Sequence, residues 1–355
     1  MSKKGIKTWK VAATYIGTVV GAGFATGQEI LQFFTRFGVM GLAGLIFTTI
    51  MFIIFGYLIM DLGNKLHASS HLEIIKYTSG NKLGIVIDLV ITFFLFGSFS
   101  AMIAGTGALF TQQFNLPSVL GNILMSTLAA VTVLTGINGV INSISLVVPF
   151  LMAAVISTSI FSFINAPPDI SAAANISSSG LINNWFLAAV LYVSYNIIIS
   201  IAVLGPLGRE AKNKKSVKNG AILGGLGLGL GSVMIYLSLS GNIPEIETLE
   251  VPMIYISGKI SYSMQFYYSI ILIAEIYTTA IGSLYGFVSR ITSFQNNSIN
   301  SRLVVLIVTI TALLASQFGF SNIVKYFYPL VGYCGIVLLM CLIYSKFFGN
   351  KIRSL

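Results

Sequence analysis

The sequence predicts an all-α membrane protein that crosses the bilayer ten times. Three observations lead to this fold class: the composition, the spacing of the apolar stretches, and the distribution of positive charge. Of the 355 residues, 55% are hydrophobic and only 8% are charged, and the mean hydropathy is +0.89. Soluble domains carry about 25% charged residues, so this composition indicates a polytopic membrane protein.

The apolar stretches recur at nearly regular intervals, and each approaches the ~20 residues that a helix needs to cross a bilayer. The lysine-bearing start runs directly into the first stretch without a clear cleavage site, so we expect no cleavable signal peptide. The long connections 165–183 and 241–261 are each predicted to hold a short surface helix. The predicted spans are 10–35, 39–63, 83–112, 118–136, 140–164, 184–207, 218–240, 262–292, 302–317 and 321–347.

Positive charge is distributed unequally between the two predicted sides of the membrane. All of the 20 lysines and arginines except Arg36, Lys259 and Lys325 fall at the chain ends or in loops predicted on one side. By the positive-inside rule that side is the cytoplasm, so both termini are expected there and the number of spans is even. The net charge of +10 therefore belongs to cytoplasmic loops, and nucleic acid is not an expected partner.

The first span contains the most informative segment of the chain, residues 17–29, which carries four glycines and ends on Glu29. Glycine weakens a helix, and unpaired backbone groups are tolerated at membrane depth only where protein buries them or where they line a cavity. The segment therefore predicts a broken helix beside a binding site. A broken helix of this kind favours a transporter.

Ten spans suggest two sets of five, and two related sets with an odd number of spans must have inverted topology. The approximate repeats are 10–164 and 184–347. Residues 26–29 (Thr-Gly-Gln-Glu) close the first span of one repeat, and residues 207–210 (Leu-Gly-Arg-Glu) close the first span of the other. The two segments lie on opposite sides of the membrane, as inversion requires.

The sixth span carries interruptions of its own. Ser194, Tyr195 and Asn196 lie inside it, and the segment 205–208 (Gly-Pro-Leu-Gly) lies near its predicted cytoplasmic end. Polar or Gly/Pro-interrupted spans in corresponding positions of two halves mark the binding site of many transporters. The sixth span is therefore predicted to be broken like the first.

The motif Gly17-x-x-x-Gly21-Ala22-Gly23 resembles the unwound first helix of the amino acid–polyamine–organocation (APC) superfamily, whose fold is the LeuT-type inverted repeat of five plus five helices. The whole segment 17–29 is similar to that of the YkvI-like bacterial membrane proteins of this superfamily. The resemblance implies a single transmembrane transporter domain over residues 1–355 in a bacterial cytoplasmic membrane.

The resemblance also implies roles for individual residues. Gly21, Ala22 and Gly23 would expose backbone amides to a substrate carboxylate, which agrees with the partial positive charge of a half-helix N-terminus. Ser194, Tyr195 and Asn196 would face the same cavity. One sodium ion would be held by the carbonyls of Gly17 and Val20 and by the hydroxyls of Thr278 and Thr279. Phe24 replaces the asparagine of a second sodium site that some relatives have.

Glu275 lies close to the midpoint of the eighth predicted span. A carboxylate at the bilayer centre costs at least ~2.5 kcal/mol and indicates a functional group. Glu275, Thr278 and Thr279 follow one another at i, i+3 and i+4 and share a helix face. Oxygen ligands on one helix face suit Na⁺, whereas a buried glutamate also suits proton transfer. Both interpretations remain open, and a purely structural role is the third.

Glu29 closes the broken first helix near the predicted outer surface. There it is expected to act as part of an extracellular gate or to pair with Arg36. A capping or interfacial role is the alternative.

Together these features predict a secondary active transporter, an ion-coupled symporter that works by alternating access on a small amino acid or related organic solute. Its expected partners are this solute and membrane lipid, with Na⁺ or H⁺ as the coupling ion, no cofactor and no enzymatic activity. The alternatives are a channel for ions or small neutral solutes and a LeuT-fold sensor that does not transport. The sequence does not predict an oligomeric state.

Overall fold

The computed structural model describes residues 5–68, 71–135, 138–171, 180–291 and 299–348. Helices account for almost all of this part of the chain, and it contains no β-strand. One isolated bridge pairs Ile6 with Ala211 and so ties the N-terminal segment to the end of α8. The all-α prediction is confirmed for these residues.

Seven helices of the described residues are long and apolar enough to cross a membrane, and two shorter apolar helices, Ser118–Leu134 and Arg302–Phe318, accompany them. The long helices are α4 (Val39–Leu66), α5 (His71–Phe114), α7 (Asn138–Asn165), α8 (Trp185–Glu210), α9 (Lys214–Ser240), α11 (Tyr262–Ile291) and α14 (Tyr328–Phe348), the last preceded by α13 (Phe320–Asn322) and a π-helical turn, Ile323–Phe327. The shorter ones belong to α6 (Ser118–Thr135) and to α12 (Ile299–Ala315) with the 3₁₀ turn that follows it.

The first predicted span is broken, as expected from its glycines. It forms α1 (Thr8–Val19), α2 (Ala22–Thr26) and α3 (Gln28–Phe33), followed by a 3₁₀ turn over Thr35–Phe37. The first interruption lies at Val20 and Gly21, and the second lies at Gly27, which has a left-handed backbone with φ of 81°. Glycine adopts this conformation without the steric penalty of a side chain.

The sixth predicted span is not broken, which corrects the prediction made from its polar and Gly/Pro residues. α8 is a continuous helix from Trp185 to Glu210. Ser194 and Asn196 direct their side-chain donors to carbonyl oxygens of neighbouring residues, so neither interrupts the helical ladder. Pro206 lies in the final turns, where its missing N–H removes a single backbone bond.

The glycines of α8 serve close packing. A Cβ on Gly208 would overlap the carbonyl oxygen of Met60 in α4, and a Cβ on Gly63 of α4 would overlap the carbonyl oxygen of Gly205. Small residues at such crossings let helix backbones approach closely in membrane proteins. The segment 205–208 therefore holds α4 and α8 together.

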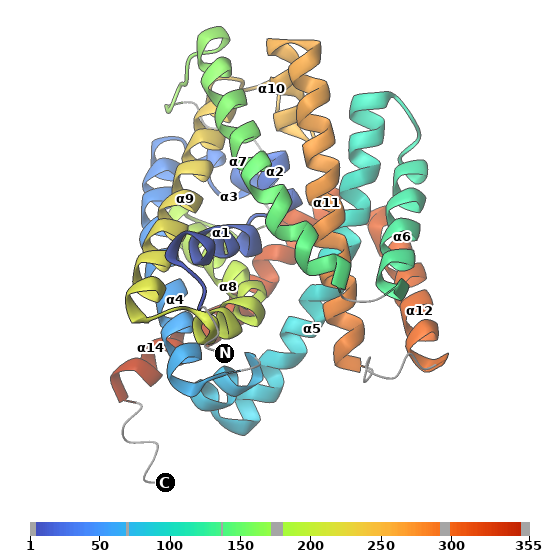
Figure 1. Ribbon diagram of the computed structural model, residues 1–355. Helices are drawn as coiled ribbons and strands as arrows, with labels where there is room; N and C mark the ends of the chain where they lie inside the picture. The colour runs from blue at the N-terminus through green and yellow to red at the C-terminus, as the bar shows by residue number, and fades with distance from the viewer. Residues whose placement is uncertain (1–4, 69–70, 136–137, 172–179, 292–298, 349–355) are drawn as a thin grey trace.

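Two groups of helices surround the break in the first span (Figure 1). In one group α4 packs against α8 and α9, and α1 packs against α9 and α8. In the other, α5 packs against α6, α11 and α12. Contacts of α7 with α9 and α11, and of α14 with α8 and α5, join the two groups. The broken helix thus belongs to the first group through α1 and contacts the second group where α2 meets α11.

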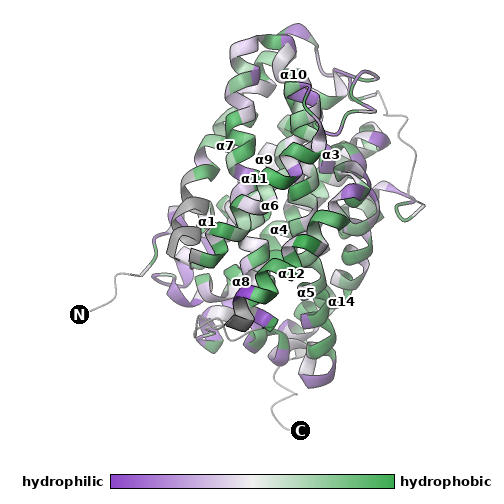
Figure 2. Ribbon diagram, turned by 90° about the vertical axis from the view of Figure 1, so that its right-hand side faces the viewer, coloured by the Kyte–Doolittle hydropathy of each residue, from purple (hydrophilic) through white to green (hydrophobic). Residues whose placement is uncertain are grey.

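The surface has the polarity of a membrane protein. Figure 2 shows hydrophobic residues along the middle of the helices and hydrophilic residues gathered toward the two ends. On α12, Leu303, Leu306, Ile307 and Ile310 are exposed at helical spacing and form one apolar stripe. Such a stripe suits contact with lipid.

The connection after α9 contains α10 (Pro252–Ile260), which agrees with the short helix predicted in residues 241–261. α10 packs against α2, and Met253 lies beside Gly27 at the turn between α2 and α3. Gln112 of α5 holds this connection with two hydrogen bonds, one to Val251 O at 2.8 Å and one from Val251 N at 3.0 Å. Burial raises the pKa of the neighbouring Glu250 carboxyl. This segment covers α2 and the bend at Gly27. In the other long connection, residues 172–179 lie outside the described part of the chain, so the short helix predicted there is untested.

Gly208→Ala is expected to destabilise the protein, because the added methyl group meets backbone rather than a movable side chain. Overpacking of this kind costs about 1–3 kcal/mol, which should lower the midpoint of thermal unfolding in detergent by several degrees. Gly282→Ala is the matched control, because a Cβ at Gly282 has no atom within 4 Å. Equal midpoints for the two variants would contradict the proposed α4–α8 contact.

Candidate functional site

The break between α1 and α2 leaves backbone groups unpaired inside the protein. Val20 N donates to Ile16 O at 2.8 Å and closes α1, and the next backbone bond runs from Ala25 N to Gly21 O at 2.9 Å. Among the described residues, the amides of residues 21–24 and the carbonyls of residues 17–20 have no backbone partner across the break. Helix ends buried in this way require side chains, water or a ligand as partners.

Glu275 and Thr279 of α11 lie on one side of this break. A Cβ on Gly21 would lie 3.8 Å from Thr279 Cγ2 and 3.9 Å from its hydroxyl oxygen. The carboxyl group of Glu275 lies next to the Thr279 hydroxyl, its side chain is 2% exposed, and its Oε2 has no hydrogen-bond partner in the described residues. Thr278 is also buried, but its hydroxyl donates to the carbonyl of Glu275 at 3.0 Å.

The structure therefore brings Glu275 and Thr279 to the break and places the free carbonyls of Gly17 and Val20 at the end of α1. Carbonyl, hydroxyl and carboxylate oxygens are the ligands that hard cations prefer. Whether they bind an ion stays a prediction.

The three consecutive polar residues of α8 do not face one cavity, contrary to the arrangement that the resemblance implies. Successive residues of a helix point about 100° apart. Ser194 Oγ lies 2.6 Å from Gly332 O and so joins α8 to α14, while Asn196 Nδ2 donates to Tyr192 O at 2.9 Å. Of Ser194, Tyr195 and Asn196, it is Tyr195 that lies in the aromatic cluster beside the break.

Glu29 lies inside the protein, whereas the sequence placed it near the outer surface. The chain bends at the left-handed Gly27, and the side chain of Glu29 lies against Gly23, where a Cβ would overlap its carboxyl group. Glu29 is 4% exposed. Arg36 does not pair with it, because Arg36 donates to Ile182 O at 3.0 Å and its guanidinium lies over the Phe37 ring. Glu29 is therefore buried and not at the outer surface, and its role as a gate stays a prediction.

The surroundings of Glu29 are tyrosines and phenylalanines. The carboxyl group of Glu29 interacts with the hydroxyls of Tyr195 and Tyr192. Tyr328 lies close enough to Glu29 to interact with its charge. Glu29 Oε2, Tyr192 Oη and Tyr195 Oη lack a well-formed hydrogen bond in the described residues. We call these residues, with the rings of Phe33 and Phe94 that contact them, the Glu29 cluster.

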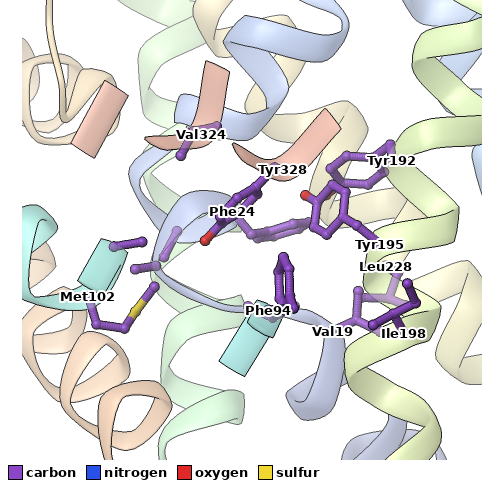
Figure 3. Packing of buried hydrophobic residues seen from close by; sticks show 14 of the residues in the cluster. Val19, Phe24, Phe94, Met102, Tyr192, Tyr195, Ile198, Leu228, Val324 and Tyr328 are labelled. Carbon is purple, nitrogen blue, oxygen red and sulfur yellow. The ribbon is translucent and has the colours of Figure 1, made fainter. Parts of the chain in front are cut away.

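Figure 3 shows Phe24, Phe94, Tyr195 and Tyr328 converging from different elements. The ring centroids of Tyr195 lie 5.0 Å from Tyr328, 5.5 Å from Tyr192 and 6.0 Å from Phe94. Tyr192, Tyr328 and Phe94 are not among the site residues predicted from the sequence. The i, i+3 spacing of Tyr192 and Tyr195 was the one signal in the sequence, because residues at this spacing share a helix face.

A second polar cluster lies at the far end of α11 and joins it to α5. Arg290 forms an ion pair with Asp88 at 2.8 Å, donates to Thr92 Oγ1 at 3.0 Å, and contacts His71. This cluster closes the end of the molecule opposite α10.

The comparison with solved structures identifies the fold. The fold is similar to that of MhsT in complex with L-phenylalanine (TM-score 0.67, 16% identity, 98% of this chain and 91% of that chain). It is also similar to a Na⁺-coupled sialic acid symporter (TM-score 0.67, 11% identity, 96% of this chain and 80% of that chain). A third similar structure is inward-facing Mhp1 (TM-score 0.64, 13% identity, 93% of this chain and 74% of that chain). These are LeuT-fold transporters, and their fold is the one found here.

Sequence comparison then gives the family. The chain is 32% identical over 350 residues to the membrane protein YkvI of Bacillus subtilis (strain 168), covering 98% of this chain and 97% of YkvI. It is 29% identical over 328 residues to YyaD of the same organism, covering 92% and 94%. No family model matches the sequence. The protein belongs to the YkvI family of membrane proteins.

Gly23→Ala and Gly21→Ala are expected to differ in stability. A methyl group at Gly23 must displace the buried Glu29 carboxyl, at a cost of about 1–3 kcal/mol. Gly21 has an extended backbone and open space to 3.8 Å, so its alanine variant should remain within ~0.5 kcal/mol of the wild type. Thermal unfolding of the purified proteins without added solute measures the difference, and a Gly21→Ala variant at least as unstable as Gly23→Ala would refute this packing.

Proposed function

We propose that the protein is an ion-coupled symporter that moves a small amino acid or a related organic solute by alternating access. The observation that carries the proposal is the broken helix α1–α2 with two buried carboxyl groups beside it, those of Glu29 and Glu275, each of which has one oxygen without a hydrogen-bond partner in the described residues. Irregular backbone and buried carboxylates inside a membrane protein mark substrate and ion pathways.

The grouping of the helices supports an architecture of ten membrane helices in a five-plus-five inverted repeat. The broken helix α1–α3 and α4 correspond to α8 and α9, and these elements form one bundle. In the same way, α5 and α6 correspond to α11 and α12, and these four helices form the other bundle. Rocking of one bundle against the other around a fixed site is the movement that this class of fold uses.

In the proposed mechanism the coupling ion binds between α1 and α11. Its ligands are the carbonyls of Gly17 and Val20, the hydroxyls of Thr278 and Thr279, and the carboxylate of Glu275, which takes either Na⁺ or a proton. The solute binds beside the break, next to Gly21, Ala22, Gly23 and Tyr195. Coupling follows if the ion and the solute both favour the same closed state.

The protein is proposed to lie in the cytoplasmic membrane of a bacterium with both termini in the cytoplasm. The relatives YkvI and YyaD are proteins of Bacillus subtilis. The positive-inside rule gives the orientation.

Reconstitution in proteoliposomes tests the proposal. A thermal-shift screen of amino acids with and without Na⁺, at two pH values, selects the solute and the ion for uptake. A symporter will show saturable uptake driven by the ion gradient, and preloaded solute will accelerate exchange. Flux that grows linearly with the gradient would instead indicate a channel, and binding without uptake would indicate a sensor.

Glu275→Gln is expected to abolish ion-driven accumulation, because the amide keeps the size of the side chain but neither carries a proton nor offers a charge to a cation. Equilibrium exchange of solute should persist in this variant, which separates loss of coupling from loss of folding. Glu210→Gln is the matched control, since that carboxylate is 44% exposed and lies at the end of α8. Accumulation by Glu275→Gln at the wild-type level would remove Glu275 from the mechanism.

Thr279→Val and Thr279→Ser separate the hydroxyl of this residue from its volume. Valine keeps the shape but removes the oxygen, and loss of a hydrogen bond to a charged group costs about 1.5–3 kcal/mol. The ion concentration that gives half-maximal uptake should therefore rise about tenfold or more in the valine variant, and it should stay near the wild-type value in the serine variant. Wild-type ion dependence in Thr279→Val would exclude the hydroxyl as a ligand.

A further inference from the structure

We propose that the Glu29 cluster binds the ammonium group of the transported solute, so that the protein selects solutes by their amine. The proposal depends on the proposed transport function only for the location of the solute beside the break. It adds a specific residue, Glu29, and a chemical class, primary amines, to that function.

The first argument is charge. Glu29 is 4% exposed and lies against Gly23 of the broken helix. In the described part of the chain, the ion pairs belong to other carboxylates, those of Asp61, Asp88, Glu210 and Glu245. A buried carboxylate is stable only with a cation or with its own proton. Glu29 therefore either keeps its own proton or receives a cation, and a solute amine can supply that cation.

The second argument is the number of acceptors. Glu29 Oε2, Tyr192 Oη and Tyr195 Oη are three buried oxygen atoms without a well-formed hydrogen bond in the described residues. A primary ammonium group carries three N–H donors. Each tyrosine can donate its hydroxyl proton toward Glu29 and still accept a bond from the ammonium. Donors and acceptors of the cluster are then all satisfied.

The third argument is the nature of the walls. Phe33 lies 5.6 Å from Tyr192 and 5.7 Å from Tyr195, and Phe94 and Tyr328 complete the enclosure. Ring faces attract an organic cation through their quadrupole, whereas a hard inorganic cation requires several oxygen ligands. The oxygen-rich side of the break is that of Thr279 and Glu275. The aromatic side is suited to an ammonium group.

The same electrostatics disfavour a solute carboxylate next to Gly23. That glycine is covered by the Glu29 carboxyl group, and two negative charges at this distance in a low-dielectric site repel each other strongly. A substrate carboxylate must therefore lie away from Gly23. The amine is the end of the solute that the cluster holds.

The test uses binding to the purified full chain, measured by thermal shift and by equilibrium binding, with three families of related probes. L-leucine carries both groups, 3-methylbutylamine keeps the amine and lacks the carboxylate, and 4-methylpentanoate keeps the carboxylate and lacks the amine. The same comparison is made for L-alanine and L-phenylalanine. We expect at least one amino acid and its matching amine to stabilise the wild type, and no desamino acid to do so.

Glu29→Gln should weaken binding of the amino acid and of the amine by about tenfold or more, because a charged hydrogen-bond partner is lost. Glu210→Gln should bind as the wild type does. Tyr195→Phe keeps the ring and removes one acceptor, so a loss of about two- to tenfold is expected. Without solute, Glu29→Gln should be at least as thermally stable as the wild type, since it removes an unpaired buried charge.

Four outcomes would overturn the inference. The first three are stabilisation by desamino acids equal to that by their parents, undiminished amine binding in Glu29→Gln, and no binding of any amine up to 10 mM. The fourth is a solute-free Glu29→Gln protein less stable than the wild type, which would mean that Glu29 stabilises the fold instead. Failure of transport has a separate signature. Amine binding that depends on Glu29, without uptake, would refute the transporter and leave the amine site in place.

Discussion

The structure depends on the backbone groups that are left unpaired where α1 ends and α2 begins. Inside a membrane protein each unpaired N–H or C=O costs several kcal/mol if nothing meets it. The sequence creates this cost with Gly21, which follows the last turn of α1 in an extended conformation. Thr279 lies beside Gly21 at the break, and at the other end of α2 the Tyr268 hydroxyl donates to the carbonyl of Ala25 at 2.6 Å.

The helices around the break pack closely against one another at points away from it. The Tyr15 hydroxyl of α1 donates to Phe52 O of α4 at 2.7 Å, and Gly224 of α9 leaves room for the Tyr15 ring. α4 and α8 meet backbone to backbone at Gly63 and Gly208. Because these contacts involve backbone atoms and small residues, the bundle of α1, α4, α8 and α9 is well suited to move as a unit. The interrupted backbone is therefore confined to a rigid frame.

The sequence predicted the break in the first span because its cause is local: several glycines and a carboxylate interrupt an apolar stretch. It failed for α8 because the effect of Ser194, Asn196 and the glycines is decided by their neighbours. Ser194 has Gly332 opposite it, and Gly208 has the Met60 carbonyl, so the same residue types support a continuous helix. Glu29 was misplaced for a similar reason, since the bend at Gly27 uses a left-handed conformation that glycine permits and that the sequence alone does not specify. The burial of Glu275 could be predicted from its position near the middle of a span, without knowledge of its neighbours in the fold.

Two buried carboxylates beside one break suggest how a solute and an ion become coupled. Each carboxyl group has one oxygen without a hydrogen-bond partner in the described residues, and enclosing two negative charges in a low-dielectric interior is unfavourable unless each receives a cation or a proton. In the proposed mechanism the coupling ion neutralises Glu275 and the amine neutralises Glu29. One ligand alone leaves a single charge uncompensated, and the closed state that both require is then poorly populated. Because a ligand shifts an equilibrium only by its differential affinity for the two states, this electrostatic penalty is what would make movement of the solute depend on the ion.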